Sequence, residues 1–320
     1  MERALSEVTL SDPRRALQFC TYMVSDPPKR AYWLCCLRIT SRAFDVDEEA
    51  LIWKQGVFSW ARRLADLLEE AQNLRLLTIS CMDALLWEEP RIGEAISALS
   101  NLTHLELYET GRLALDLVGT MCCRPNKLVL SLLQSRRRTT PVLSRILHLN
   151  SIRCLTLSHL KEIDNFLQNG KDGPLQLSNV RDLSIEGSSV PLSVFVRVFP
   201  NIHHMRVFDT SCLGLHSLGS LWPRLRHLCG HPHHLKDWPK NSPIHCLELD
   251  TTLCQHRQQE ISDALLALEH LSPIVLSVEL LVSVEDIGFC TSLIQAAPRL
   301  RYLQLRLNIG IDLANILLRG

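Results

Sequence analysis

The sequence lacks several features that would assign it to a common functional class. Its 320 residues contain 34 lysines and arginines against 34 aspartates and glutamates, so no positive surplus predicts a nucleic-acid partner. No run of 18 apolar residues could span a bilayer, and the N-terminal residues Met1–Leu5 do not begin the apolar segment of a signal peptide. We therefore expect no membrane and no nucleic-acid partner, and a cytoplasmic or nuclear location.

The cysteines also lack a diagnostic arrangement. Twelve are present, but none forms a Cys-x-x-Cys pair, and most occupy slots beside apolar strand or helix positions, as Cys154 and Cys246 do. Buried thiols pack as small apolar residues and stay reduced inside a cell. We therefore expect neither a disulfide framework nor a structural metal.

One apolar phrase recurs along the chain. It reads apolar, two variable residues, apolar, one variable residue, apolar, as in Leu-Thr-His-Leu-Glu-Leu at 102–107 and Leu-Arg-Tyr-Leu-Gln-Leu at 300–305. After a first interval of 40 residues, the copies follow one another at 19–29 residues, close to the spacing of leucine-rich repeats. Their central residues are Leu37, Leu77, Leu105, Leu128, Leu155, Leu183, Met205, Leu228, Leu247, Leu276 and Leu303.

The phrase and the segments between its copies predict different secondary structure. Alternation over the last four positions of each phrase predicts a short strand with one buried face. Other segments show the apolar periodicity of amphipathic helices. No single strand–helix unit could bury its apolar face alone, so we expect the units to stack and share a core. The helical segments are 58–72, 92–99, 261–268 and 287–297, with single turns at 140–149 and 191–199.

We therefore predict an α/β leucine-rich-repeat solenoid, with a curved parallel β-sheet on the concave side and helices on the convex side. Residues 31–320 would form about eleven irregular units after an N-terminal helical lead-in at 1–30. The position three residues past the last apolar strand residue should carry an Asn or Cys that bonds the turn. Only one of five such positions has Asn, so we expect few side-chain hydrogen bonds along the turns of successive repeats, that is, a weak turn ladder. The five positions are Thr110, Ser188, Thr210, Thr252 and Asn308.

Strand alternation also predicts the functional surface. If the apolar positions face the core, the variable positions face the concave side of the sheet. Aromatic, histidine and arginine side chains, which binding hot spots favour, are frequent there. The candidate partner-binding residues are His104, Glu106, Tyr108, Asp182, Glu186, His204, Arg206, Phe208, His227, Glu248, Asp250, Tyr302, Gln304 and Arg306.

Two histidine-rich segments admit other interpretations. The run Arg226–His234 could bind zinc, but it contains one cysteine and has no second Cys/His pair at finger spacing, so a solvated loop is the favoured reading. His203 and His204 with Asp209 and Ser211 suggest a hydrolase, but they lie along one strand and its exit and cannot form a triad alone.

Two further motifs remain weak. Gly-Leu-His-Ser-Leu-Gly at 214–219 has one residue too many before its serine to be a nucleophile elbow. Arg136–Arg138, with Arg145, is the strongest basic run and is interpreted as a solvated loop, with phosphate or acidic-partner binding as the alternative. We expect no enzymatic activity and no cofactor.

The chain resembles the leucine-rich-repeat portion of F-box proteins, especially the expanded sets of fungi. The resemblance rests on Val8–Leu17, on Phe-Cys-Thr-Tyr-Met at 19–23, on Trp-Leu-Cys-Cys-Leu-Arg-Ile at 33–39 and on the recurring phrases. No Leu-Pro-x-Glu-type opening of an F-box precedes Val8. The resemblance implies a substrate-recruiting arm of an SCF ubiquitin ligase, which would bind Skp1 only if an F-box is encoded upstream.

The expected function is therefore recognition of an unidentified target protein on the concave face. The alternative is a free-standing leucine-rich-repeat scaffold or regulator with no ubiquitin-ligase link. The apolar segment Ile309–Leu318 has little polar cover, so we expect the isolated chain to pair or aggregate through an end.

Overall fold

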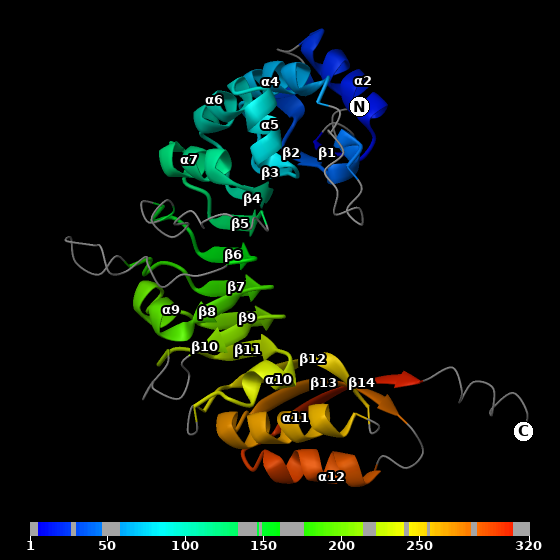
Figure 1. The fold of residues 1–320 in the computed structure, drawn as a ribbon, viewed down its shortest axis with the longest axis vertical. Helices are drawn as coiled ribbons and strands as arrows, with labels where there is room; N and C mark the ends of the chain where they lie inside the picture. The colour runs from blue at the N-terminus through cyan, green and yellow to red at the C-terminus, as the bar shows by residue number, and fades with distance from the viewer. Residues whose placement is uncertain are drawn as a thin grey trace, which may run out of the picture. The chain divides into compact units, whose positions relative to one another are not determined.

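The chain folds into two compact α/β units, Met1–His159 and Leu160–Gly320, drawn in Figure 1. The computed structural model describes residues 6–26, 30–46, 58–133, 146, 149–160, 176–213, 222–239, 243–254, 257–282 and 287–309, with the backbone alone at 190–191, 211–213, 282, 287–290 and 308–309. The strands of the main sheet described in each unit run parallel. An α/β fold with parallel sheets is thus confirmed.

The first unit contains six described strands that pair in chain order. Their register places Leu37, Leu77, Leu105, Leu128 and Leu155 directly opposite one another on successive strands, and each is buried. This shared register makes one continuous apolar row from the central residues of the recurring phrase. The strands are β1 (Glu7–Leu10), β2 (Cys36–Ile39), β3 (Leu76–Ile79), β4 (His104–Thr110), β5 (Lys127–Leu132) and β6 (Cys154–Ser158).

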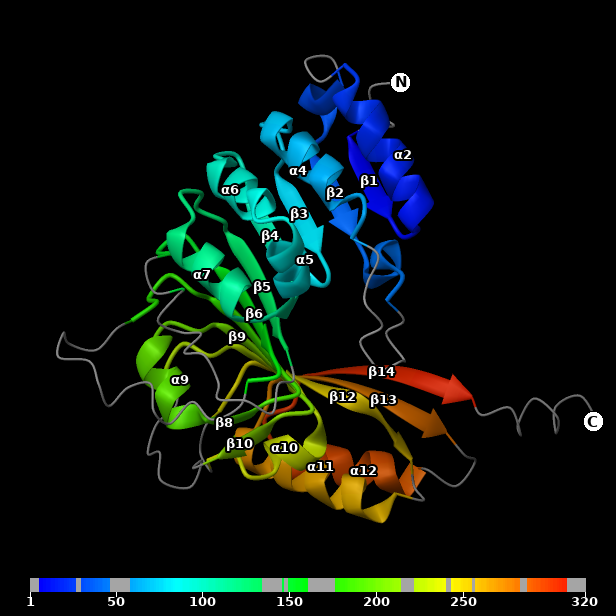
Figure 2. The same cartoon turned by 45° about the horizontal axis from the view of Figure 1, so that its top comes forward.

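Helices follow most of these strands and lie on one face of the sheet (Figures 1 and 2). The first begins where Asp12 accepts a hydrogen bond from the backbone N–H of Arg15 at 2.8 Å, the N-cap that a helix start requires. The helices are α2 (Pro13–Val24), α4 (Ala61–Glu70), α5 (Met82–Glu88), α6 (Arg91–Ala98) and α7 (Arg112–Thr120), with 3-10 turns η1 (Ala31–Trp33) and η2 (Ser41–Phe44).

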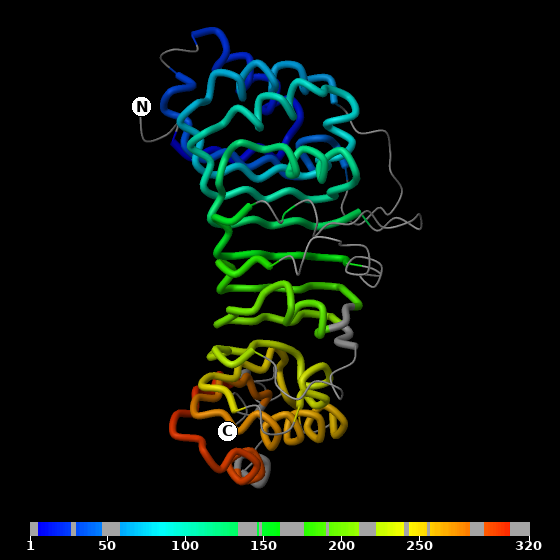
Figure 3. Tube along the Cα trace, turned by 90° about the vertical axis from the view of Figure 1, so that its left-hand side faces the viewer, coloured from blue at the N-terminus to red at the C-terminus, as the bar shows by residue number. Residues whose placement is uncertain are grey.

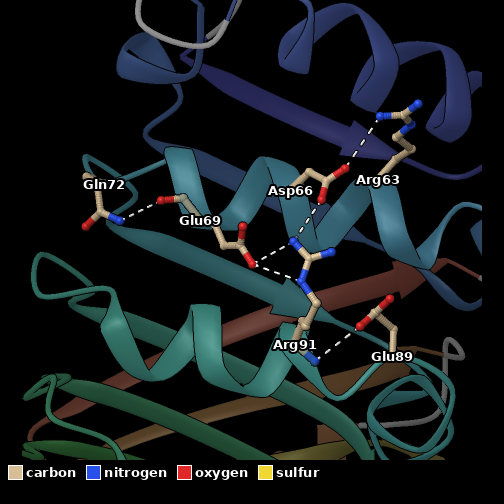
Figure 4. Close-up of polar contacts among 6 residues, drawn as sticks. All are labelled: Arg63, Asp66, Glu69, Gln72, Glu89 and Arg91. Atoms are coloured by element: carbon tan, nitrogen blue, oxygen red, sulfur yellow. Dashed lines mark hydrogen bonds and ion pairs between the residues drawn. The ribbon is translucent and has the colours of Figure 1, made fainter.

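A charged contact joins two of these helices, as Figure 4 shows. The Arg91 guanidinium, at the start of α6, donates hydrogen bonds of 2.8 Å each to the carboxylates of Asp66 and Glu69 on α4. Arg63 also lies 3.5 Å from Asp66. All four side chains are partly exposed, so the contact orients neighbouring helices more than it stabilises them.

The second unit repeats the plan with six parallel strands in its main sheet and two short strands beside it. Figure 3 shows the successive strands as neighbouring runs of the trace. The main strands are β7 (Asp182–Glu186), β9 (His204–Phe208), β11 (His227–Gly230), β12 (Cys246–Cys254), β13 (Val275–Val282) and β14 (Tyr302–Ile309), and the short pair is β8 (Ser189–Pro191) and β10 (Ser211–Leu213). The helices are α9 (Leu192–Val198), α10 (Pro232–Leu235), α11 (Gln258–Leu271) and α12 (Ile287–Ala296), and α11 and α12 lie side by side (Figures 1 and 2).

All eleven predicted central residues lie in strands of these sheets. The predicted helical segments correspond to α4, α6, α11 and α12, and the single turn at 191–199 corresponds to α9. Helices α5 and α7 and the pair β8–β10 were not predicted, and most of 140–149 lies outside the described residues. The lead-in at 1–30 contains β1, which already pairs with β2. No described helix is both long and apolar enough to cross a membrane.

The backbone turns in the same way after several strands. Four residues after the central residue of five phrases, the backbone enters the left-handed region, with φ between 40° and 61°. This recurrence indicates that the units share a turn as well as a strand. The five positions are Cys81, Glu109, His159, Gly187 and Asp209.

The residues after these turns bond the backbone more fully than the sequence suggests. Thr210 is completely buried, and its hydroxyl donates to the carbonyl of Phe208 at 2.6 Å while receiving the N–H of Ser188 at 3.4 Å. The Ser188 hydroxyl accepts the N–H of Leu160 at 2.9 Å. The Thr110 hydroxyl donates to the carbonyl of Leu107 in its own turn at 3.0 Å. In the second unit, the Ser188 and Thr210 hydroxyls therefore link successive turns where Asn or Cys was expected.

The last two predicted turn positions differ. Thr252 donates to the carboxylate of Glu279 at 2.9 Å and so bonds a side chain rather than the turn backbone. The side chain of Asn308 lies outside the described residues, as does most of 309–318.

Candidate functional site

The side chains between the buried leucines form a second face of each sheet, which we call the open face. Contacts of α5 and α7 with β4, and of α11 with β12, place these helices against the sheets, and the leucine positions they cover are buried. The alternate positions are mostly half-buried or exposed. Of the fourteen candidate residues, three lie on the first unit and eleven on the second.

The open face of the first unit is electrically balanced. The Glu106 carboxylate receives a bond of 2.6 Å from the Lys127 ammonium and one of 3.2 Å from the Thr78 hydroxyl. On β2, Arg38 forms an ion pair with Glu7 of the adjacent strand β1. Each charge on this face therefore has an opposite partner within the sheet.

The remaining two candidates of the first unit are also held locally. His104 shares a hydrogen bond of 2.9 Å with the hydroxyl of Thr103, its chain neighbour. Tyr108 is half-buried near the end of β4. The first unit thus offers a polar face with few free groups.

A row of two histidines flanked by two acids crosses the open face of the second unit. Asp182 on β7 pairs with Nδ1 of His204 on β9. The His204 and His227 rings meet edge to face with centroids 6.0 Å apart, and His227 Nε2 lies 3.5 Å from the Glu248 carboxylate. Burial, which outweighs the attraction of Glu248, lowers the pKa of His227. The lowered pKa favours the neutral imidazole, which weakens the pairing of His227 with Glu248.

A cation and an aromatic ring lie on the next positions of the same face. The Arg206 guanidinium carbon lies 5.3 Å from the centroid of the Phe208 ring, within the range of a cation–π contact. In register with Arg206 lies Cys229, which is buried, and burial raises the pKa of its thiol to about 11. Cys229 is therefore a packing residue and not a nucleophile.

A small acidic hollow opens where β12 departs from regular pairing. Its register with β13 shifts between Glu248 and Thr252, which places Asp250 at an irregularity of the kind often found beside functional sites. Burial raises the pKa of Asp250, and with the negative charge of Glu248 it outweighs the lowering effect of Arg206. The hollow has a volume of about 170 Å³ and is lined by Glu248, Leu249, Asp250, Thr251, Thr252, Ser277, Val278, Glu279 and Arg306.

The last three candidates lie on β7 and β14. Glu186, on β7, receives a hydrogen bond of 3.2 Å from the Ser184 hydroxyl. Tyr302 and Gln304 are exposed on β14, and Tyr302 leaves 67% of its surface accessible. An aromatic side chain this exposed can contact a protein partner.

The sequence analysis missed several residues of the open face. Ser277 and Glu279 line the acidic hollow from β13, and Arg38 and Lys127 neutralise the face of the first unit. All four lie in the phrases around Leu37, Leu128 and Leu276, from which no candidate was taken. Applying the same alternation to those copies would have found them.

The histidine-rich segment is helical in part, which corrects its interpretation as a loop. His233 and His234 lie in α10, whose start is capped by the His231 ring nitrogen, 3.2 Å from the His233 N–H. His233 and Lys236 each approach the buried carboxylate of Asp263 on α11 at 3.2 Å. Within the described residues no His, Cys, Asp and Glu side chains cluster as a metal site would require.

Among the described side chains, the cysteines and the remaining motif residues do not assemble a catalytic arrangement. The ten cysteines with described side chains are free thiols. His204 is engaged by Asp182, and the side chain of Ser211 lies outside the described residues. The segments 214–219 and 136–138, with Arg145, lie outside them too.

Comparison with known proteins does not assign the chain to a family. No family model matches it, and no curated protein matches its sequence.

Proposed function

We propose that this chain is a non-enzymatic recognition module that binds a target protein on the open face of its second unit. The observation that carries the proposal is the contrast in charge on the two open faces. In the first unit Glu7 and Glu106 are matched by Arg38 and Lys127. Among the described residues of the second unit, the open face carries five carboxylates and two arginines. They are Asp182, Glu186, Glu248, Asp250 and Glu279 with Arg206 and Arg306.

The chemistry of this face favours a target segment that is basic and carries an apolar or aromatic residue. The acidic hollow fits a lysine or arginine side chain, because Glu248 and Asp250 supply acceptors in a partly desolvated setting. The exposed ring of Tyr302 and the Arg206–Phe208 pair offer contact area beside it. Binding would therefore combine charge complementarity with a few aromatic contacts.

We further propose that the repeats are of the leucine-rich type and that the module recruits substrates to an F-box-type ubiquitin ligase. Support for this comes from the recurring phrase and its resemblance to the corresponding portion of F-box proteins. A scaffold or regulator without a ligase link is the rival proposal. The protein made from its complete gene should co-purify with Skp1 if the ligase proposal holds, and failure of that protein to bind Skp1 would leave the scaffold.

Site-specific photo-cross-linking tests the recognition proposal directly. A benzophenone amino acid placed at Gln304, on the open face, should yield a discrete cross-linked protein in cells that express the chain. The same probe at Leu266, which is exposed on α11 on the helical side of the second unit, is the matched control and should yield none. Equal products from both positions would contradict recognition by the open face.

A second variant set tests the chemistry of the contact. Asp250→Asn with Glu248→Gln removes two charges from the acidic hollow without changing side-chain size. The Gln304 cross-link should then weaken and lose much of its sensitivity to salt, because exposed ionic attraction is screened by added ions. An unchanged yield would show that the hollow does not hold a cationic group.

A further inference from the structure

The last described strand of the second unit has a free edge. Within the residues that the structure describes, β14 pairs only with β13 (Figure 1). The Tyr302 N–H donates at 3.1 Å to the carbonyl of Ile274, which directly precedes β13. Because the backbone groups of a strand alternate in direction, the N–H and C=O groups of Leu303, Leu305 and Leu307 point away from β13. We call this row of outward backbone groups the β14 edge.

The apolar side chains of β14 are also incompletely covered. Leu305 and Leu307 are 39% and 61% exposed, although their neighbours in register on β13, Val278 and Leu280, are buried. A strand that has neighbours on both sides gains side-chain cover from each of them. One more strand beside β14 would therefore satisfy the β14 edge and bury these leucines together.

The β14 edge lacks the features that prevent pairing at other edge strands. The segment 302–307 contains no proline, glycine or lysine, its one charge is Arg306, and its register with β13 has no bulge. The first strand of the first unit differs, because β1 has only four residues, begins with the charged Glu7 and already buries Leu10. Of these two end strands, β14 is the one suited to accept another strand.

The sequence of β14 is complementary to a second copy of itself in antiparallel orientation. When Leu305 lies opposite Leu305 of the second copy, Leu303 lies opposite Leu307 and Gln304 lies opposite Arg306. The leucines then face leucines on one side of the sheet, and the polar residues face each other on the other side. The outward N–H and C=O groups of Leu305 can exchange hydrogen bonds with those of the second copy.

Other registers fit less well. A shift of two residues in one direction places Arg306 opposite Arg306, and like charges directly opposite each other are destabilising. A shift of two residues in the other direction places Leu307 opposite Arg301. A shift of one residue moves every leucine against a residue of the polar side. The strand therefore specifies one register, centred on Leu305.

We infer that two copies of this chain form a two-fold dimer through antiparallel pairing of their β14 edges. The pairing uses each β14 edge once, so the assembly closes at two copies. The sheet of the second unit continues across the dimer axis, and the two copies present two acidic hollows. This inference goes beyond the proposed function and does not rest on it.

Sedimentation velocity of the full chain over a concentration series tests the inference. The wild type should reach twice the monomer mass of 36.4 kDa and no larger mass. Leu305→Glu should weaken the dimer at least about tenfold, because it places two carboxylates opposite each other at the two-fold axis. Leu266→Glu, at a leucine of matched exposure (40%) on α11, is the control and should leave the dimer unchanged.

A mixture of two variants tests the register. Leu305→Lys should also weaken the dimer when it is alone, but equal amounts of Leu305→Glu and Leu305→Lys should form a mixed dimer, because opposite charges then face each other. This rescue requires a residue that lies opposite itself. Circular dichroism of each variant checks that the fold is retained.

Four outcomes would overturn the inference. They are a wild type that stays monomeric at every concentration, masses that grow beyond two copies, an unchanged dimer in Leu305→Glu, and a mixture of folded variants that stays monomeric. A chain ending after Ile309 should dimerise as the full chain does. Dimerisation of the shortened chain alone would assign the β14 edge to residues 310–320 and contradict the inference.

The probe at Gln304 separates this inference from the proposed function. A cross-linked product of twice the chain's mass reports a second copy, whereas a product of any other mass reports a target protein. Loss of one product leaves the other in place, so the two proposals fail independently.

Discussion

The two units share a backbone plan but distribute their charges differently. In the first unit the open-face ion pairs Glu7–Arg38 and Glu106–Lys127 neutralise the sheet, and the exposed Arg91 bridges neighbouring helices. In the second unit the open face is acidic, and a carboxylate is buried between α10 and α11. The comparison teaches that the repeated apolar rows set the fold, whereas the polar positions between them are free to differ in function.

The buried carboxylate provides the largest expected effect. Asp263 is 3% exposed and accepts bonds from Gln259 at 2.8 Å and from Lys236 at 3.2 Å. Asp263→Ala should lower the free energy of unfolding by about 3 kcal/mol, because Gln259 and the mostly covered Lys236 lose a buried acceptor, whereas water can replace it at the exposed His233. Urea unfolding of the full chain measures the loss. A loss as small as that of an exposed ion pair would contradict the account.

The pH dependence of that contact has a defined sign. Burial by itself raises the pKa of Asp263, but hydrogen bonds from Gln259, Lys236 and His233 outweigh it, so the pKa is lowered overall. A carboxylate with a lowered pKa stabilises the fold above the usual aspartate range, and that stabilisation is lost as pH falls through the folded-state pKa. The difference in unfolding free energy between wild type and Asp263→Asn should therefore shrink between about pH 5 and pH 2. A difference that grows on acidification would contradict the assignment.

The hydroxyl ladder predicts a smaller effect and a second contrast between the units. Thr210→Ala should lower the free energy of unfolding by about 2 kcal/mol, since it removes a buried hydroxyl and leaves the Ser188 N–H unpaired. Thr110→Ala, the matched change in the first unit, removes a single bond to Leu107 and should cost about 1 kcal/mol. Urea unfolding compares the two variants. Equal losses would show that the ladder of the second unit adds no stability.

The left-handed turn gives opposite signs at two equivalent positions. Gly187→Ala places a Cβ at φ 53° and should destabilise the chain by about 1 kcal/mol. Asp209→Gly, at φ 40° in the turn after the neighbouring strand β9, should stabilise the chain by about 0.5 kcal/mol. Thermal unfolding resolves the two directions. A stabilising Gly187→Ala would contradict the shared turn.

The exposed helix contact of the first unit should have the smallest effect. Arg91→Ala removes the bonds to Asp66 and Glu69, but water replaces them at these partly exposed side chains. The change should fall well below that of Asp263→Ala in the same urea experiment. A comparable loss would mean that the first unit also depends on charge between its helices.

The sequence predicted the strands well because burial alone determines them. Leu77, Leu105 and Leu128 must share one face, so their spacing fixes the register that the structure shows. The polar contacts were not predictable, because they depend on which strands become neighbours. Nothing in the spacing indicates that Asp182 meets His204, or that β12 is irregular at Asp250.

Two errors have identifiable physical causes. Helix α10 was interpreted as a loop because it spans only Pro232–Leu235, too short for a periodic apolar pattern. The contribution of serine and threonine to the turns was missed because only asparagine or cysteine was considered, whereas the buried Ser188 and Thr210 hydroxyls both donate and accept.

The central claim is that target recognition belongs to the open face of the second unit. The most direct measurement is the affinity for the protein cross-linked at Gln304, compared between two triple alanine variants at equivalent strand positions. One changes His104, Glu106 and Tyr108 on β4, and the other changes His204, Arg206 and Phe208 on β9. The account predicts that the β9 variant loses at least about tenfold in affinity while the β4 variant binds as wild type does. Equal affinities for the two variants, or a loss confined to the β4 variant, would contradict it.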